Sequence, residues 1–576
     1  MNYSNTKVLG QPSGLFFLFF TEMWERFSFY GMRALLVLFL TAEVITGSAQ
    51  SGWGWDTARA TSLYGTYAML LYLTPIIGGI IADKYLGARK TIIIGASIMT
   101  LGQFCLFMNS HTMFYVGLCC LVIGVGLFKP NMPSILSQMF IGEPEKKDSA
   151  YTIFYMGVNC GAFFGMMLCG YLGIHWGWHL GFGLAGIFML LGTLQFIFAK
   201  NLMDNLGAAP KRMPEAEKKV DIGEKHNPFT IVDIILTVIV AVLGLTYALN
   251  EQLVKGGFTD VFGFLDNPYL SGQLLVILGT LLLFIYLIIS RTMRYEGEVR
   301  RRMFAVLCIA MFIIFFYIGF DQAPSSLTII TRDHIDRTLT GNGLLIFNIV
   351  NSLLVLVPLA IITYVLIRLA IATFKIIPIT NLILLVCFML LWGGSIYMLY
   401  QKFHETVSEI EVTWFGTLNS FFVITLASSI SKIWDSKYNP PVAFKYGFGL
   451  LLVSIGFLAI WLGDVYFNVG GKIPMLFLVL IYLFLTLGEL FVSPVGLSYI
   501  SKLVPARMLA FMFGMWYLAI AIAQKIAASL GGQVDVIKVK WGLDAFFLMF
   551  AGITAGAAII VMAMHPLLKK LMGEVK

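Results

Sequence analysis

Residues 112–130 read TMFYVGLCCLVIGVGLFKP. Residues 112–128 are uncharged, and the last two are Lys129 and Pro130. A helix of about 20 apolar residues is long enough to cross the hydrocarbon core of a bilayer. Similar stretches recur from end to end of the 576-residue chain, which is 59% hydrophobic and 12% charged. Its mean hydropathy is +0.85, and a soluble domain carries about 25% charged residues. The sequence therefore predicts an all-α polytopic membrane protein.

The apolar stretches predict sixteen membrane-spanning helices, and an even number places both chain termini on the same side of the membrane. The expected spans lie near 15–41, 60–83, 91–110, 112–130, 150–172, 178–198, 229–250, 270–290, 303–322, 342–368, 378–401, 413–433, 444–463, 473–500, 507–530 and 543–566.

The charges are distributed unequally between the two sides. Basic residues gather in the loops near 84–90, 200–225 and 291–302, on the side of the termini, whereas 42–59 and 251–269 on the other side contain several acids. Lys and Arg accumulate in cytoplasmic loops, so we expect both termini to be cytoplasmic. The same pattern accounts for the net charge of +8, and we expect no nucleic-acid binding.

We predict that the chain is organised in three segments. Residues 1–199 form an N-terminal six-helix bundle, 200–302 a cytoplasmic linker and two extra transmembrane helices, and 303–576 a C-terminal bundle with an additional helical hairpin at 342–401. Two repeated halves place a binding site near the membrane midplane, where the halves meet. A less favoured alternative is that part of 342–401 is re-entrant or lies at the interface.

The residues that usually hold metals or catalyse reactions form no such pattern. All seven cysteines fall inside apolar stretches, where small buried hydrophobic residues are expected, and the seven histidines are scattered. His175 and His179 are four residues apart but have no acid near them in the sequence. We therefore expect that the protein binds no metal or cofactor and is not an enzyme. The first apolar stretch also contains Glu22 and Glu25, which a cleavable signal peptide would not tolerate.

The first predicted span carries an unusual number of charges. At about 100° per residue, six of its side chains fall within an arc of about 140°: Glu22, Glu25, Arg26, Phe29, Tyr30 and Arg33. Ion pairs within the helix that merely neutralise charge would explain this face. We favour a polar cavity, because an ionisable group at membrane depth is costly and usually functional.

Five more polar side chains lie within or at the end of apolar stretches: Lys129, Asn159, Asp321, Asn419 and Glu489. Lys129 can be read as a snorkelling lysine at a helix end, and Asn159 as part of an interhelical hydrogen bond. Glu489 stands four residues before Ser493 and near Pro494, which can bend the helix. Together they are candidates for the lining of one cavity between the two halves.

These residues belong to motifs that resemble the proton-dependent oligopeptide transporter family, a branch of the major facilitator superfamily. Residues 22–31 resemble its ExxERFxYYG motif, and 78–102 resemble its first long signature. Residues 151–163 resemble its second signature, and 320–327 resemble its FEQxxSSL block. The resemblance covers nearly the whole chain.

The resemblance implies a major facilitator superfamily fold, with two six-helix bundles plus extra helices. It implies a proton-coupled symporter that imports di- and tripeptides by alternating access. Such a protein would be an integral, multi-pass protein of the bacterial inner membrane, surrounded by lipid, functional as a monomer and driven by protons without another cofactor.

The resemblance also implies roles for individual residues. The candidate proton-coupling acids are Glu22, Glu25, Asp321 and Glu489. The candidate substrate-binding residues are Arg26, Tyr30, Arg33, Tyr72, Lys129, Asn159, Tyr317, Asn419, Glu489, Ser493 and Trp516. Two ion pairs between the bundles are implied, Lys129 with Glu489 and Arg33 with Asp321.

The chain departs from the family pattern in several places. Phe29 stands where the motif usually has Tyr, and Cys160 replaces an aliphatic residue. Residues 414–420 lack the Gln and Pro of the family's WFQSxNP block. Gly65 stands where animal members carry a proton-sensing His, so coupling here would depend on carboxylates. The pair of spans at 342–401 is also not expected.

Two other functions compete with this interpretation. A transporter of the same fold for another small anion or a peptide-like metabolite is the first, although the intact Glu22, Glu25 and Arg26 argue against it. A polytopic membrane enzyme is less favoured, because no reactive constellation is evident.

Overall fold

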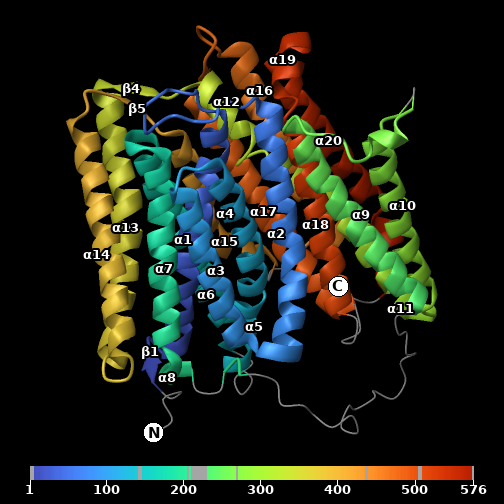
Figure 1. Ribbon diagram of the computed structural model, residues 1–576, viewed down its shortest axis with the longest axis horizontal. Coiled ribbons are helices and arrows are strands. Elements are labelled where there is room, and N and C mark those ends of the chain that lie inside the picture. Colours follow the sequence, from blue (N-terminus) through green and yellow to red (C-terminus); the bar gives the residue numbers. More distant parts are fainter. Residues whose placement is uncertain are drawn as a thin grey trace.

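The computed structural model describes residues 6–140, 146–203, 206–208, 230–267, 270–434, 439–503 and 509–573. Long helices run side by side through most of the molecule, and short strands and helices cover their ends (Figure 1). Most of the linker predicted at 200–227 lies outside the described residues.

The first part of the chain forms two short strands and a group of helices. They are β1 (Lys7–Val8), β2 (Gln11–Pro12), α1 (Ser13–Thr41), α2 (Thr57–Ile81), the π-helix η2 (Ala82–Leu86), α3 (Ala88–Phe107), α4 (His111–Phe128), α5 (Asn131–Met139), α6 (Lys147–Trp176), α7 (Trp178–Phe198) and α8 (Lys200–Met203).

A helical hairpin follows, and then the second group of helices. The hairpin contains α9 (Ile231–Lys255), the 3₁₀-helix η5 (Gly263–Leu265) and α10 (Gly272–Met293). The rest comprises α11 (Gly297–Phe320), α12 (Ser326–His334), β3 (Ile335–Asp336), β4 (Thr338–Thr340), α13 (Gly341–Thr373), α14 (Pro378–His404), β5 (Val407–Glu409), α15 (Val412–Trp434), α16 (Val442–Tyr466), β6 (Ile473–Pro474), α17 (Met475–Leu503), α18 (Leu509–Gly531), α19 (Val534–Trp541), α20 (Leu543–Ala563) and α21 (His565–Met572).

The predicted membrane-spanning architecture is confirmed. Among the described residues, fifteen helices are long and apolar enough to cross a membrane. The remaining expected span is α1, which is 29 residues long and carries the charged face from Glu22 to Arg33. The hairpin at 342–401 consists of two such helices, of 33 and 27 residues.

Polar side chains mark where several helices begin. The Asp56 carboxylate accepts a hydrogen bond from the Arg59 backbone amide and caps α2. Thr230 and Asp233 form a reciprocal capping box at the start of α9. Each cap satisfies backbone amides that have no partner within the helix.

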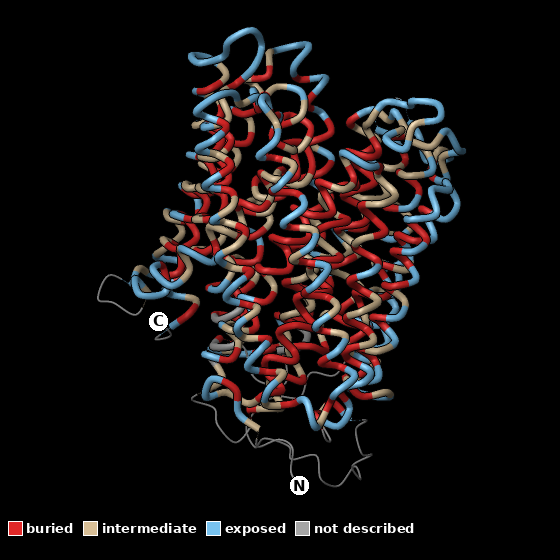
Figure 2. Tube along the Cα trace, turned by 90° about the vertical axis from the view of Figure 1, so that its left-hand side faces the viewer, coloured by how far each residue is buried: buried red, intermediate tan, exposed pale blue. Residues whose placement is uncertain are grey.

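The buried residues form two large hydrophobic cores, and in Figure 2 they follow the inner parts of the helices. The first core joins α1–α7 and the second joins α11, α12 and α15–α21. The α13–α14 hairpin belongs to the first core although it follows α11 in the chain. The Phe388 ring of α14 lies 5.6 Å from that of Phe20 and 5.7 Å from that of Trp24.

The two bundles meet along two contacts, α2 with α18 and α6 with α15. Glycines allow the close approach at both. A Cβ added to Gly65 of α2 would lie 2.3 Å from Ala528 Cβ, and one added to Gly170 of α6 would lie 2.0 Å from Thr413 Oγ1. A histidine at position 65 would not fit against Ala528 in this conformation. We call these two contacts the α2–α18 seam and the α6–α15 seam.

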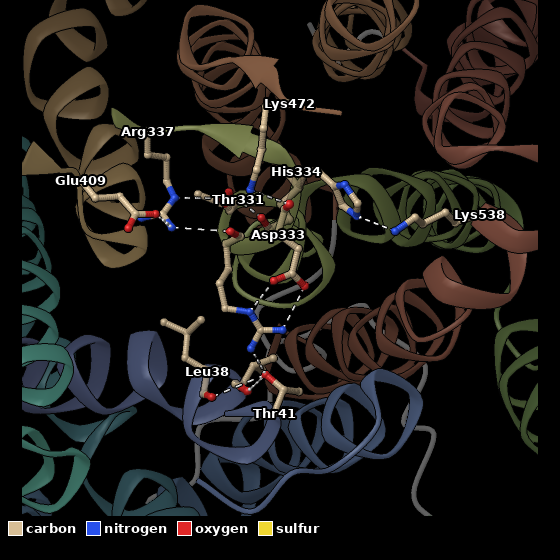
Figure 3. A network of polar contacts seen from close by, with 12 residues as sticks. Leu38, Thr41, Thr331, Asp333, His334, Arg337, Glu409, Lys472 and Lys538 are labelled. Carbon is tan, nitrogen blue, oxygen red and sulfur yellow. Dashed lines mark hydrogen bonds and ion pairs between the residues drawn. The ribbon is translucent and has the colours of Figure 1, made fainter. Parts of the chain in front are cut away.

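A polar network joins the bundles at the end away from β1, which we call the far side (Figure 3). Arg332 of α12 donates to the Thr41 hydroxyl of α1 at 2.8 Å and pairs with Asp333. Arg337 pairs with Glu409 of β5 and donates to the Thr331 carbonyl. The hydrogen bond from Arg332 to Thr41 therefore ties the two bundles together at the far side.

Gly78 and Gly79 offer a matched test of the packing between α2 and α4. A Cβ at Gly78 would lie 1.9 Å from the Gly126 carbonyl oxygen, whereas one at Gly79 would meet its nearest neighbour, Pro130 Cβ, at 4.0 Å. Gly78→Ala should therefore destabilise the protein by about 1–3 kcal/mol through overpacking. Thermal unfolding in detergent measures this, with Gly79→Ala as the control. Equal melting temperatures for the two variants would contradict the packing.

Candidate functional site

The charged face of α1 forms a compact, buried ion cluster. Arg26 Nε lies 2.8 Å from Glu22 Oε1 and 3.1 Å from Glu25 Oε2. The Glu22 and Glu25 side chains are almost completely buried, whereas Arg26 is partly exposed to the interior. The helical spacing of these residues brings them together, as their positions in the sequence indicate.

Two turns further along α1, Arg33 links the two bundles. Its Nη2 lies 3.3 Å from Asp321 Oδ1, and its Nε donates to the Tyr64 hydroxyl of α2 at 2.7 Å. Gln524 Nε2 of α18 donates to Asp321 Oδ2 at 2.5 Å. Asp321 follows the last residue of α11, so its carboxylate ties α1 to two helices of the C-terminal bundle. The ion pair expected between Arg33 and Asp321 is present.

A second polar group lies in the C-terminal bundle. Asn419 Nδ2 of α15 donates to Glu489 Oε2 and to Thr486 Oγ1 of α17, both at 3.0 Å. Ser493 follows Glu489 one turn later on the same helix. A carboxylate, an amide and a hydroxyl therefore stand together on α15 and α17.

Lys129 is not paired with Glu489 in this conformation. Its ammonium lies over the Tyr72 ring, 4.5 Å from the centroid, and among the described residues no ion pair joins it to Glu489. Tyr72 in turn lies 6.4 Å from the Tyr517 ring of α18. A cation and two aromatic rings thus stand where the N-terminal bundle faces α18.

The remaining predicted residues, Asn159, Tyr317 and Trp516, lie in three different environments. Asn159 is buried and donates to the Tyr155 carbonyl of its own helix. Tyr317 packs edge-on against the Phe320 ring. Trp516 is buried in the second core against Gly496 of α17.

A pocket with a cavity volume of about 80 Å³ lies between the two bundles and is partly open to solvent. Three predicted residues line it, namely Tyr30, Arg33 and Asn419. Apolar and aromatic side chains from both bundles complete the wall, among them Met166, Phe320, Pro324, Tyr482 and Leu485. The pocket therefore joins a guanidinium of α1 to an amide of α15 across the interior.

Several residues of this site were not predicted from the sequence. Tyr64 and Gln524 hold the ion pair between Arg33 and Asp321, and Thr486 shares the Asn419 amide. Gln524 is followed by Lys525 within an apolar stretch, and a polar pair at that depth was a usable signal. Tyr64 and Thr486 gave no such signal, because both are common in apolar helices.

The fold brings an acid to one of the histidines. His175 has no acid near it in the sequence, but Glu411 Oε1 lies 2.8 Å from its Nε2. Within the described residues no group of three or more His, Cys, Asp or Glu side chains could hold a metal ion.

Two helix bundles with a pocket between them, lined by apolar side chains and a few polar ones, are typical of membrane transporters. A family model described as POT family matches residues 89–397 and 372–549, and the chain belongs to this family.

Individual relatives agree over nearly the full length. The chain is 30% identical to "Uncharacterized transporter YclF" of Bacillus subtilis, covering 92% of this chain and 89% of that protein. It is 28% identical to "Di-/tripeptide transporter" of Lactococcus lactis, covering 100% and 99%. A crystal structure of "peptide transporter POT in complex with sulfate" superposes with a TM-score of 0.70 at 27% identity, covering 98% and 96%.

The Arg33–Asp321 pair makes a stability prediction. Arg33→Met leaves a buried carboxylate without its cation and should cost about 3–5 kcal/mol. Replacing both partners, in Arg33→Met with Asp321→Asn, should cost much less. Thermal unfolding of the purified variants measures both. Arg302→Met is the control, since it removes a more exposed pair with Glu298, and a similar loss there would contradict the argument.

Proposed function

We propose that this protein is a proton-coupled symporter that imports di- and tripeptides by alternating access. The observation that carries the proposal is the separation of charge across the interior. The cations Arg26, Arg33 and Lys129 stand on the N-terminal bundle, and Asn419 and Glu489 stand on the C-terminal bundle. The names of the Lactococcus relative and of the crystallised neighbour support the same cargo.

A short peptide matches this arrangement because its two ends are charged and its side chains vary. Arg and Lys offer charge-assisted donors to the peptide carboxylate. Glu489, with the Asn419 amide beside it, suits the ammonium group. Aromatic walls from Tyr30, Tyr72 and Tyr317 leave room between the ends for different side chains. A site built in this way would accept many peptide sequences.

Proton coupling follows from the bridge between the bundles. Asp321 attracts Arg33 only while it is ionised, because protonation removes the charge that holds the pair. A proton on Asp321 would therefore weaken a contact that ties α1 to α11 and shift the population toward a state open on the other side. Glu22, Glu25 and Glu489 are the other acids proposed to carry or relay protons.

The proposal includes location and assembly. Basic loops on the side of the termini support a cytoplasmic location for that side, and the far side would then face outward from a bacterial inner membrane. The protein would act as a monomer in lipid, as a transporter and not as an enzyme, and protons would be its only coupling ion.

Reconstitution into liposomes tests the function. Dialanine uptake should require an inward proton gradient, and unlabelled dipeptides should compete with it. If nitrate but not unlabelled dipeptides inhibits the uptake of labelled dialanine, the result would favour the alternative that this transporter carries another small anion. Absence of gradient-driven dialanine uptake would contradict the proposal.

Variants of the proposed coupling residues should separate proton-driven accumulation from counterflow exchange. Asp321→Asn and Glu22→Gln remove an ionisable acid while keeping nearly the same volume, so proton-driven accumulation should be abolished. Counterflow exchange, which needs no net proton movement, should survive. Both are measured with labelled dialanine in the same liposomes. Full pH-driven accumulation by either variant would exclude that acid from coupling.

Lys129 makes a binding prediction. Its ammonium lies at the interior beside Tyr72, where it would meet the peptide carboxylate. Lys129→Ala should weaken dipeptide affinity by about tenfold or more, since a hydrogen bond to a charged group contributes about 1.5–3 kcal/mol. Inhibition of uptake by unlabelled dipeptide measures this, with Lys90→Ala, which changes an exposed lysine near the start of α3, as the control. Equal affinity in both variants would remove Lys129 from the site.

A further inference from the structure

Each of the two extra hairpins contributes to one seam between the bundles. The α9–α10 hairpin and the α13–α14 hairpin stand at opposite ends of the molecule in Figure 1. The first contacts α2, which packs against α18. The second contacts α6, which packs against α15. The hairpins therefore lie where the N-terminal and C-terminal bundles must separate if the far side is to open.

At the α2–α18 seam, the hairpin inserts a carboxylate. Glu251 of α9 has Oε2 2.5 Å from the Lys525 ammonium of α18. Its Oε1 accepts a hydrogen bond from the Ser62 hydroxyl of α2 at 2.7 Å. Lys525 also donates to Thr66 Oγ1 of α2 at 2.7 Å. One glutamate of the hairpin thus holds a helix from each bundle.

This cluster is the main attachment of the first hairpin. Only 11% of the most apolar stretch of α9 and 22% of that of α10 is buried in protein. The neighbouring Gln252 donates to the Ser62 and Thr66 hydroxyls, both at 2.9 Å. Polar contacts, more than apolar packing, therefore seat this hairpin on the seam.

At the α6–α15 seam, the other hairpin inserts a cation. Lys402 near the end of α14 has its ammonium 2.7 Å from Glu411 Oε1, directly before α15. His175 at the end of α6 contacts the same oxygen. Burial raises the pKa of Glu411, but the contacts with His175 and Lys402 outweigh it, so the pKa lies below its usual value and the carboxylate stays charged. Trp414 of α15 also donates to Asn351 of α13.

We propose that the two hairpins are clamps that hold the far side closed, with Glu251 and Lys402 as their positioning residues. The proposal rests on the proposed alternating-access function. The two clamps are alike in design and opposite in charge, because one hairpin gives a carboxylate to a lysine and the other a lysine to a carboxylate. If the far side opens, each of the two contacts must either break or move together with the helices that it joins.

The first clamp also lies next to the proposed coupling acid. Gln524, which donates to Asp321, and Lys525, which binds Glu251, are adjacent on α18. A movement of this turn of α18 therefore changes both contacts together. Release of the bridge between Arg33 and Asp321 and release of the clamp become parts of one step.

Cysteine labelling tests the clamps without any transport measurement. Thr61 and Thr413 are buried at the two seams, where Thr61 faces Gly532 and Thr413 faces Gly170. Thr61→Cys and Thr413→Cys therefore report opening through their reaction with a water-soluble maleimide. Peptide mass spectrometry reads labelling at these positions separately from the seven native cysteines.

Glu251→Gln and Lys402→Met should each raise the labelling rate at both reporters by roughly fivefold or more, the lower range for coupled sites. Glu298→Gln, which alters a more exposed ion pair with Arg302, should change neither rate. A rise at the local reporter alone would mean that the hairpin only packs locally, and would overturn the proposal. Unchanged rates would overturn it as well.

A charge exchange keeps the test decisive if one variant folds poorly. Glu251 also pairs with Lys255 of its own helix at 2.9 Å, so the exchange is made in a Lys255→Gln background. There, Glu251→Lys combined with Lys525→Glu recreates the pair in the opposite sense and should restore slow labelling relative to either single change. Fast labelling in the folded double variant would overturn the clamp. A wild-type protein that moves no peptide would instead contradict the proposed function and leave the labelling result intact.

Discussion

An uncompensated charge at membrane depth costs at least about 2.5 kcal/mol, and the interior of this protein is organised by the need to pair such charges. Arg26 is balanced by two glutamates of its own helix. Arg33 finds its partner, Asp321, in the opposite bundle, and Lys525 finds Glu251 in a third unit of the fold. The pairs that cross between units connect charge balance to the relative position of the bundles.

Packing at the seams complements these pairs. Where α2 meets α18 and α6 meets α15, glycines bring helix surfaces into close contact, so the closed arrangement gains dispersion energy along two narrow lines. The ion pairs contribute direction and position at the same lines. A rigid bundle with small contact seams and a few crossing charges is suited to two discrete arrangements, because each contact is either made or lost.

The sequence predicted the spans well, because apolar length alone identifies a helix in a membrane. The family resemblance implied Arg33 and Asp321 as partners. Neither the sequence nor the resemblance indicated Glu251 or Lys525, whose partners lie far away in the chain, and the resemblance gave Lys129 a partner that this conformation does not provide. The place of the α13–α14 hairpin could not be predicted for a similar reason. Its helices are mostly apolar with a few buried polar residues such as Asn348 and Asn381. No pattern in the sequence says that they meet Phe20 and Trp24.

The position of the α13–α14 hairpin has a consequence for biogenesis. Leu359 and Phe388 complete the core formed by α1–α7, yet they are synthesised after α11 and α12. Domains generally fold in order during synthesis, the N-terminal one first. Here the first bundle must wait in the bilayer, with lipid against part of its surface, until residues up to His404 have left the ribosome. Assembly of the two halves is therefore interleaved, and a nascent chain that stops after α7 is not a finished folding unit.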